Sequence, residues 1–166
     1  HAALFDPNGG EITAAPYTLA AGGNVVEYVP DYNYYGQDSF AFKADDGGVA
    51  PDGGESNQAL VQILVQARPP VTTSLSVEIP ENQMTGLTLQ GTDPDGDVLD
   101  FVITALPTNG HLTDPNGGPI ATVPYTLLNH GRVINYTPER FYLGSDQFIY
   151  HAADGIFTST PSTVSL

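Results

Sequence analysis

The chain has 166 residues and carries 19 acidic against four basic side chains, for a formal net charge of −15. A surface of this sign repels phosphate backbones and anionic lipid headgroups, so the composition argues against partners such as nucleic acid and against membrane insertion. Cysteine is absent, so no disulfide holds the fold, and no apolar run approaches the roughly 20 residues of a membrane-spanning helix.

The N-terminal part of the chain predicts short antiparallel strands separated by turns. Residues 6–10 read DPNGG, and Asn-Gly readily adopts the positive φ angles of a tight hairpin turn. Apolar side chains then recur with a period of two, which is typical of strands that bury one face. The apolar positions are Val26, Tyr28, Phe40, Phe42, Ala44, Val61, Ile63 and Val65.

A proline-rich segment interrupts this pattern in the middle of the chain. Residues 66–70 read QARPP, and two successive prolines lack backbone donors and favour an extended, semi-rigid connection. We therefore place a linker at residues 67–70, between a first domain at residues 1–66 and a second domain at residues 71–166.

The second domain has the same strand pattern as the first. Leu99, Phe101 and Ile103 share one face of a predicted strand, and Phe148, Tyr150 and Ala152 share one face of another. With 18 glycines and 14 prolines dividing the chain, short strands at this spacing predict a β-sandwich or barrel.

The two domains are copies of one repeat. LFDPNGG at residues 4–10 recurs as LTDPNGG at residues 112–118, and Tyr17 corresponds to Tyr125, an offset of 125 − 17 = 108. About half of residues 4–47 are identical to their counterparts in this ungapped register. Because the first copy starts about 40 residues into the repeat, we expect it to be incomplete in this window of a longer array, and the second copy to be nearly complete.

Three stretches of the second copy resemble a known family. They are IPEN at residues 79–82, GTDPDGDVLDFVI at residues 91–103 and INYTPERFYLGSDQFIYHAADG at residues 134–155. These motifs resemble the bacterial cadherin-like, immunoglobulin-fold tandem repeats of large extracellular surface proteins. The resemblance implies an all-β fold of tandem immunoglobulin-like, antiparallel Greek-key β-sandwiches, the first of them incomplete here, and a location outside the cell or at its surface.

An acidic loop in the second copy is a candidate calcium site. Asp93, Asp95 and Asp97 place three carboxylates within five residues, and Ca²⁺ prefers several oxygen ligands. The resemblance adds Glu81 and Asp154 to the candidate ligands. The alternative is a solvated turn in which the aspartates cap their own backbone.

A tyrosine-rich run in the first copy is a candidate sugar-binding site. Tyr34 corresponds to Tyr142 and is expected to be structural, which leaves Tyr32 and Tyr35 as candidates for stacking on a cell-surface polysaccharide.

These observations favour a structural or adhesive extracellular tandem-repeat protein, stabilised by calcium, that forms a surface stalk or fibre. The expected partners are neighbouring repeats and other copies of the protein. One alternative is a carbohydrate-binding or spacer module of a secreted polysaccharide-degrading enzyme, and another is a filament subunit that polymerises by strand complementation. The chain carries no nucleophile elbow, phosphate loop or HExxH motif, so we expect it not to be an enzyme.

Overall fold

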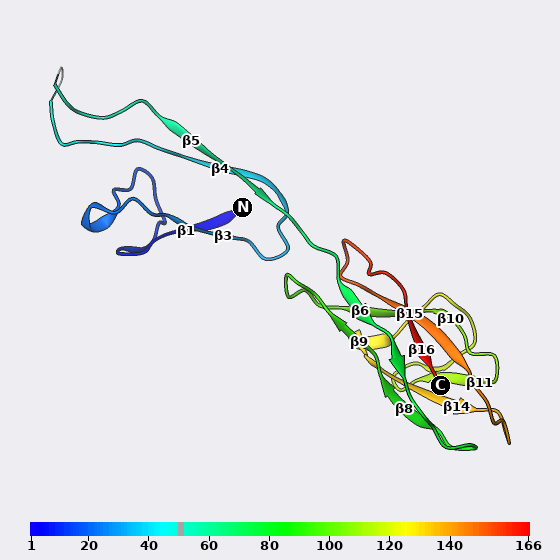
Figure 1. Cartoon of the computed structure of the whole chain (residues 1–166). Coiled ribbons are helices and arrows are strands. Elements are labelled where there is room, and N and C mark those ends of the chain that lie inside the picture. The colour runs from blue at the N-terminus through cyan, green and yellow to red at the C-terminus, as the bar shows by residue number, and fades with distance from the viewer. Residues whose placement is uncertain (50–51) are drawn as a thin grey trace. The chain divides into compact units, whose positions relative to one another are not determined.

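The computed structural model describes residues 1–49 and 52–166, which form β-strands and two short 3₁₀ helices, with no α-helix among them. The all-β architecture predicted from the apolar alternation is thus confirmed. The chain folds as two compact units, unit 1 at His1–Ala67 and unit 2 at Arg68–Leu166 (Figure 1).

Unit 1 consists of two small antiparallel sheets. One sheet has the order β2-β1-β3 and the other is the hairpin β4-β5, in which Phe40 pairs with Val61. The elements are β1 (Ala2–Asp6), β2 (Gly10–Glu11), η1 (Ala20–Gly22), β3 (Glu27–Pro30), β4 (Gly36–Phe42) and β5 (Ala59–Val65).

Unit 2 contains a five-stranded sheet with the order β13-β10-β15-β16-β7, a four-stranded sheet with the order β12-β11-β14-β8, and the two-stranded ladder β6-β9. Neighbouring strands are antiparallel except β16 and β7, which run parallel. The elements are β6 (Val71–Thr73), β7 (Leu75–Ser76), β8 (Thr85–Thr88), β9 (Gln90–Thr92), β10 (Asp100–Ala105), β11 (Gly110–Asp114), β12 (Gly118–Ile120), β13 (Tyr125–Thr126), η2 (Leu128–His130), β14 (Val133–Pro138), β15 (Gln147–Ala153) and β16 (Ser162–Ser165).

The core of unit 2 is built from the alternating apolar positions of both larger sheets. Phe101 and Ile103 on β10 and Phe148 on β15 are fully inaccessible to solvent, as predicted from their spacing. They pack with residues of the other sheet, so one hydrophobic cluster joins the two layers as in a β-sandwich. The cluster comprises Leu87, Leu89, Leu99, Phe101, Ile103, Leu112, Ile120, Leu127, Ile134, Tyr136, Phe148, Tyr150, Ala152 and Val164.

Two buried tyrosine hydroxyls connect this core to the strand ends. The Tyr150 hydroxyl lies within hydrogen-bond distance of the carbonyl oxygens of Thr73 (2.7 Å) and Gln90 (2.9 Å), which ties β6 and β9 to β15. Tyr136 donates to Asp146 Oδ2 at 2.9 Å. Both hydroxyls therefore have partners, as buried polar groups require.

Candidate metal centre

Two loops of unit 2 bring three aspartates together. Residues 93–99 connect β9 to β10, and Gly96 adopts the positive φ (84°) that lets this loop turn sharply. Asp154 follows the end of β15. One carboxylate oxygen each of Asp93, Asp97 and Asp154 lie within 4.8 Å of one another, and all three residues are half-buried.

Two of these carboxylates are only half satisfied by the protein. Asp93 Oδ1 accepts hydrogen bonds from the backbone N–H groups of Asp95 (2.7 Å) and Asp97 (3.2 Å). Asp154 Oδ1 accepts from those of Ile156 (2.7 Å) and Phe157 (2.6 Å). The second oxygen of each, Oδ2, is buried and accepts no hydrogen bond from the described residues. Burying a carboxylate oxygen without a hydrogen-bond donor costs free energy. A cation bound to these two oxygens would offset that cost.

The electrostatics of the three-aspartate cluster also favour a bound cation. Burial raises the pKa of Asp97, and the negative charges of Asp93, Asp154 and Asp95 raise it further. The ionised form of Asp97 is therefore disfavoured by its surroundings, and a cation between the three carboxylates would remove that penalty.

Asp95, the middle acid of the loop, has a different partner. Arg68 binds it through Nε (2.8 Å) and Nη2 (2.6 Å) to Oδ1, and through its backbone N–H to Oδ2 (2.7 Å). Arg68 Nη2 also donates to the carbonyl oxygen of Pro94 at 2.6 Å. These contacts hold the pKa of Asp95 below its usual range, and both carboxylate oxygens are occupied. Asp95 is thus a structural anchor for the start of unit 2, a role that was not predicted from the sequence.

Glu81 does not join the cluster. It is exposed and precedes β8, whereas the acidic loop follows β9, so the length of these two successive strands separates them (Figure 1). The neighbouring Asn82 accepts a hydrogen bond at Oδ1 from the backbone of Phe141, which lies beyond the far end of β14. Of the five candidate ligands, the structure brings together Asp93, Asp97 and Asp154.

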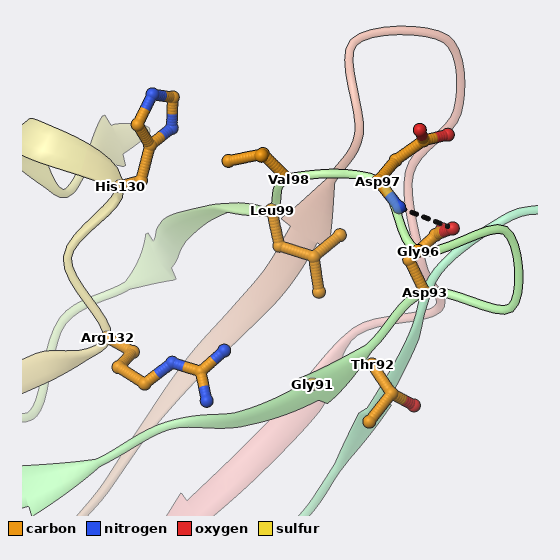
Figure 2. Close-up of a pocket in the computed structure, with 9 residues that line it drawn as sticks. All are labelled: Gly91, Thr92, Asp93, Gly96, Asp97, Val98, Leu99, His130 and Arg132. Atoms are coloured by element: carbon orange, nitrogen blue, oxygen red, sulfur yellow. Dashed lines mark hydrogen bonds between the residues drawn. The ribbon is translucent and has the colours of Figure 1, made fainter. Parts of the chain in front are cut away.

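The acidic loop borders an open hollow of about 430 Å³, whose lining residues are drawn in Figure 2. Asp93 and Asp97 lie at one side of the hollow, and His130 and Arg132 lie at the other (Figure 2). The two basic residues have partners of their own, because His130 Nδ1 lies 2.8 Å from Asp100 Oδ1 and Arg132 lies over the ring of Phe101 at 5.7 Å. The hollow therefore borders the acidic loop on the side of Asp93 and Asp97, whereas Asp154 is not among the residues that line it.

The two candidate sugar-binding tyrosines lie in the segment between β3 and β4 of unit 1. Tyr32 is 75% exposed and Tyr35 is 55% exposed. Tyr34 stacks on His1 with a ring distance of 4.7 Å. The sugar-binding role of Tyr32 and Tyr35 stays a prediction.

The three clustered aspartates fit a hard divalent cation. Ca²⁺ accepts six to eight oxygen ligands, and carboxylates combined with water are a usual set for a site open on one side. The cluster contains only oxygen donors, with neither histidine nor cysteine, which disfavours zinc and other softer metals.

Comparison with known proteins places unit 2 in a family. The bacterial Ig domain family matches residues 67–166. Two integrin beta-like proteins of Dictyostelium discoideum, C and E, are 34% and 32% identical over 102 residues, which is 60% of this chain and 5% of each relative. Among solved structures, an endo-fucoidan hydrolase of glycoside hydrolase family 107 aligns with 97% of this chain and 24% of its own at 18% identity, with a TM-score of 0.38.

The family match agrees with the immunoglobulin-fold resemblance seen in the acidic loop and in the segment from Ile134 to Gly155. In the described part of the chain, no helix combines the length and apolarity needed to cross a bilayer. The chain belongs to the bacterial Ig domain family.

Proposed function

We propose that this chain is a structural segment of an extracellular tandem-repeat protein, and that one Ca²⁺ bound by Asp93, Asp97 and Asp154 stabilises unit 2. The observation that carries the calcium proposal is the pair of buried oxygens, Asp93 Oδ2 and Asp154 Oδ2, that have no hydrogen-bond donor among the described residues and lie beside a third carboxylate.

The structural part of the proposal follows from the module type and the repeat. Bacterial Ig domains are typically non-catalytic extracellular modules, and two copies of one unit occur in 166 residues. The chain spans about a twentieth of the length of the curated relatives it matches. Neighbouring repeats are therefore its first expected partners, in a stalk or fibre that presents adhesive parts of a longer protein.

Calcium would act by joining two loops that are distant in sequence. Asp93 and Asp97 lie between β9 and β10, whereas Asp154 lies after β15, so an ion shared by all three links the start of β10 to the end of β15. These two strands pair only in the folded state, so the ion binds the folded state selectively and stabilises it by mass action.

Isothermal titration calorimetry with calcium tests the site directly. We expect one saturable site in the 166-residue chain, and we expect Asp97→Asn to weaken binding at least about tenfold, equivalent to about 1.4 kcal/mol. Asparagine keeps the size of the side chain but removes the charge that faces Asp93 and Asp154.

Glu81→Gln is the matched control, because it also removes one carboxylate that was a candidate ligand but lies away from the cluster. Its affinity should equal that of the unaltered chain. The proposal fails if calcium gives no saturable heat, or if Asp97→Asn binds as tightly as Glu81→Gln while circular dichroism shows both variants folded.

A further inference from the structure

Arg68 holds the acidic loop through four hydrogen bonds. Its backbone N–H and its guanidinium bind both carboxylate oxygens of Asp95, and Nη2 also donates to the carbonyl oxygen of Pro94. The side chains of Arg68 and Asp95 are 60% and 27% exposed, and an ion pair this accessible contributes modestly to stability by itself. Its effect on the conformation of the loop therefore matters more than its effect on the stability of unit 2.

Asp95, the residue that Arg68 holds, is also bonded to a candidate ligand. Its backbone N–H donates to Asp93 Oδ1 at 2.7 Å, and the N–H of Asp97 donates to the same atom at 3.2 Å. Between them, Gly96 has a positive φ of 84°, and its N–H donates to the carbonyl oxygen of Asp93 at 3.3 Å. These bonds occupy Oδ1 and leave Oδ2 of Asp93 for a cation, so the position of Asp95 affects how Asp93 is presented.

The segment that carries Arg68 is paired with the strand that leads into the loop. Val71 at the start of β6 lies opposite Thr92, the last residue before the loop. Pro69 and Pro70 connect Arg68 to β6, and their fixed φ angles restrict the path of the backbone there. The strand pairing and the prolines thus bring Arg68 to the loop with few alternative positions.

We propose that Arg68 is a positioning residue for the calcium site, and that it orders the acidic loop through Asp95 before an ion binds. The proposal rests on the calcium site of the proposed function and adds a residue that is not itself a ligand. A loop that already has its binding conformation loses less conformational freedom on binding, so its affinity is higher. Arg68 therefore raises the affinity of the site for calcium although it carries a positive charge.

The charge of Arg68 alone predicts the opposite effect. A positive side chain beside carboxylates weakens their attraction for a cation, so its removal strengthens calcium binding if only charge matters. Arg132 provides the comparison, because it lines the same hollow as Asp93 and Asp97 but lies over the ring of Phe101 (Figure 2). The sign of the change in affinity thus separates the positioning effect of Arg68 from its charge.

Calorimetric titration with calcium measures that sign in the 166-residue chain. We expect Arg68→Gln to weaken binding about fivefold, because the loop loses its clamp while all three ligands remain. Arg132→Gln removes the same charge and should leave the affinity unchanged or raise it. If Arg68→Gln binds calcium as tightly as the unaltered chain, or more tightly, this proposal is wrong and the calcium site stands. If the unaltered chain binds no calcium, both are wrong.

A double-mutant cycle determines whether Arg68 acts through Asp95. In a chain that carries Asp95→Ala, the clamp has no anchor, so Arg68→Gln should no longer weaken calcium binding. An equal loss of affinity with and without Asp95→Ala would overturn the proposed route.

Hydrogen exchange in excess EGTA tests the same idea without calcium. The amide protons of Asp95 and Asp97 donate to Asp93, and they should exchange several-fold faster in Arg68→Gln, whereas the amides of β14 keep their protection. Unchanged exchange at Asp95 and Asp97 would show that the loop is ordered without Arg68 and would contradict the proposal.

Discussion

At the residue scale, the surroundings of each aspartate decide its role. Asp114 is buried at 1% exposure, yet it is satisfied by the backbone N–H groups of Asn116 and Leu128 and by the hydroxyl of Tyr125. Asp93 is less buried but retains an oxygen without a donor among the described residues. The number of donors around a carboxylate, more than its burial, therefore separates a structural aspartate from a candidate ligand.

Asp146 shows the structural role most fully. It accepts hydrogen bonds of 2.9 Å from the backbone N–H groups of Thr108, Asn109 and Gln147 and from the Tyr136 hydroxyl. We expect Asp146→Asn to destabilise unit 2 by about 1–3 kcal/mol at neutral pH, because one amide oxygen cannot replace two charged acceptors. Urea unfolding measures the loss, with the exposed Glu139→Gln as a charge-matched control.

The effect of Asp146 depends on pH in a defined direction. Burial raises the pKa of Asp146, but the hydrogen bonds from Thr108, Asn109, Tyr136 and Gln147 outweigh it and hold the pKa below the usual value. The stabilisation is thus fully present above about pH 4 and is lost as pH falls through the lowered pKa. The difference between Asp146→Asn and the unaltered chain should shrink below about pH 4; a constant difference down to about pH 2 would contradict this account.

At the element scale, the same alternation of apolar residues gives a buried strand in unit 2 and a partly exposed strand in unit 1. Phe148 on β15 is fully buried in the hydrophobic cluster that joins the two sheets of unit 2, whereas Phe40 on β4 is half-buried. Phe148→Ala should therefore cost about 3–5 kcal/mol, and Phe40→Ala less than about half of that. Differential scanning calorimetry compares the two variants, and equal losses would contradict the difference in packing.

The strands could be predicted from the sequence because burial of one face imposes a period of two. Phe101 with Ile103, and Phe148 with Ala152, follow that rule and are fully buried. That Asp93, Asp97 and Asp154 lie at the same end of the sandwich was predictable in part, because the resemblance implies the order of the strands. The role of Arg68 was not predictable, because its contact with Asp95 spans 27 residues and depends on the path of the folded chain.

Glu81 shows where the resemblance to a known family was not enough to predict the site. The motif IPEN resembles a calcium-binding segment, but the resemblance does not fix how far the segment lies from the acidic loop along the sheet. The exposure of Phe42 is a further case, because alternation predicts a buried face without saying which chain segment covers it.

At the scale of the whole molecule, the formal net charge of −15 favours the binding of a cation. Self-repulsion of so many carboxylates opposes compact folding, and a divalent ion relieves it most where the carboxylates cluster. In unit 1, Asp46 corresponds to Asp154, and its Oδ1 accepts hydrogen bonds from the backbone N–H groups of Gly48 (2.8 Å) and Gly54 (2.7 Å). The three-carboxylate cluster lies in unit 2, so we expect the calcium effect to belong to that unit.

The central claim is that calcium stabilises unit 2 through the three clustered aspartates. Thermal unfolding in about 5 mM Ca²⁺ against excess EGTA tests it most directly, with Asp93→Asn and Asp95→Asn beside the unaltered chain. We predict a calcium-dependent rise in the melting temperature of unit 2 that Asp93→Asn abolishes. Asp95→Asn should keep the rise from a lower starting point, because it loses only the Arg68 contact. A melting temperature that calcium leaves unchanged, or a rise that survives in Asp93→Asn, would contradict the account.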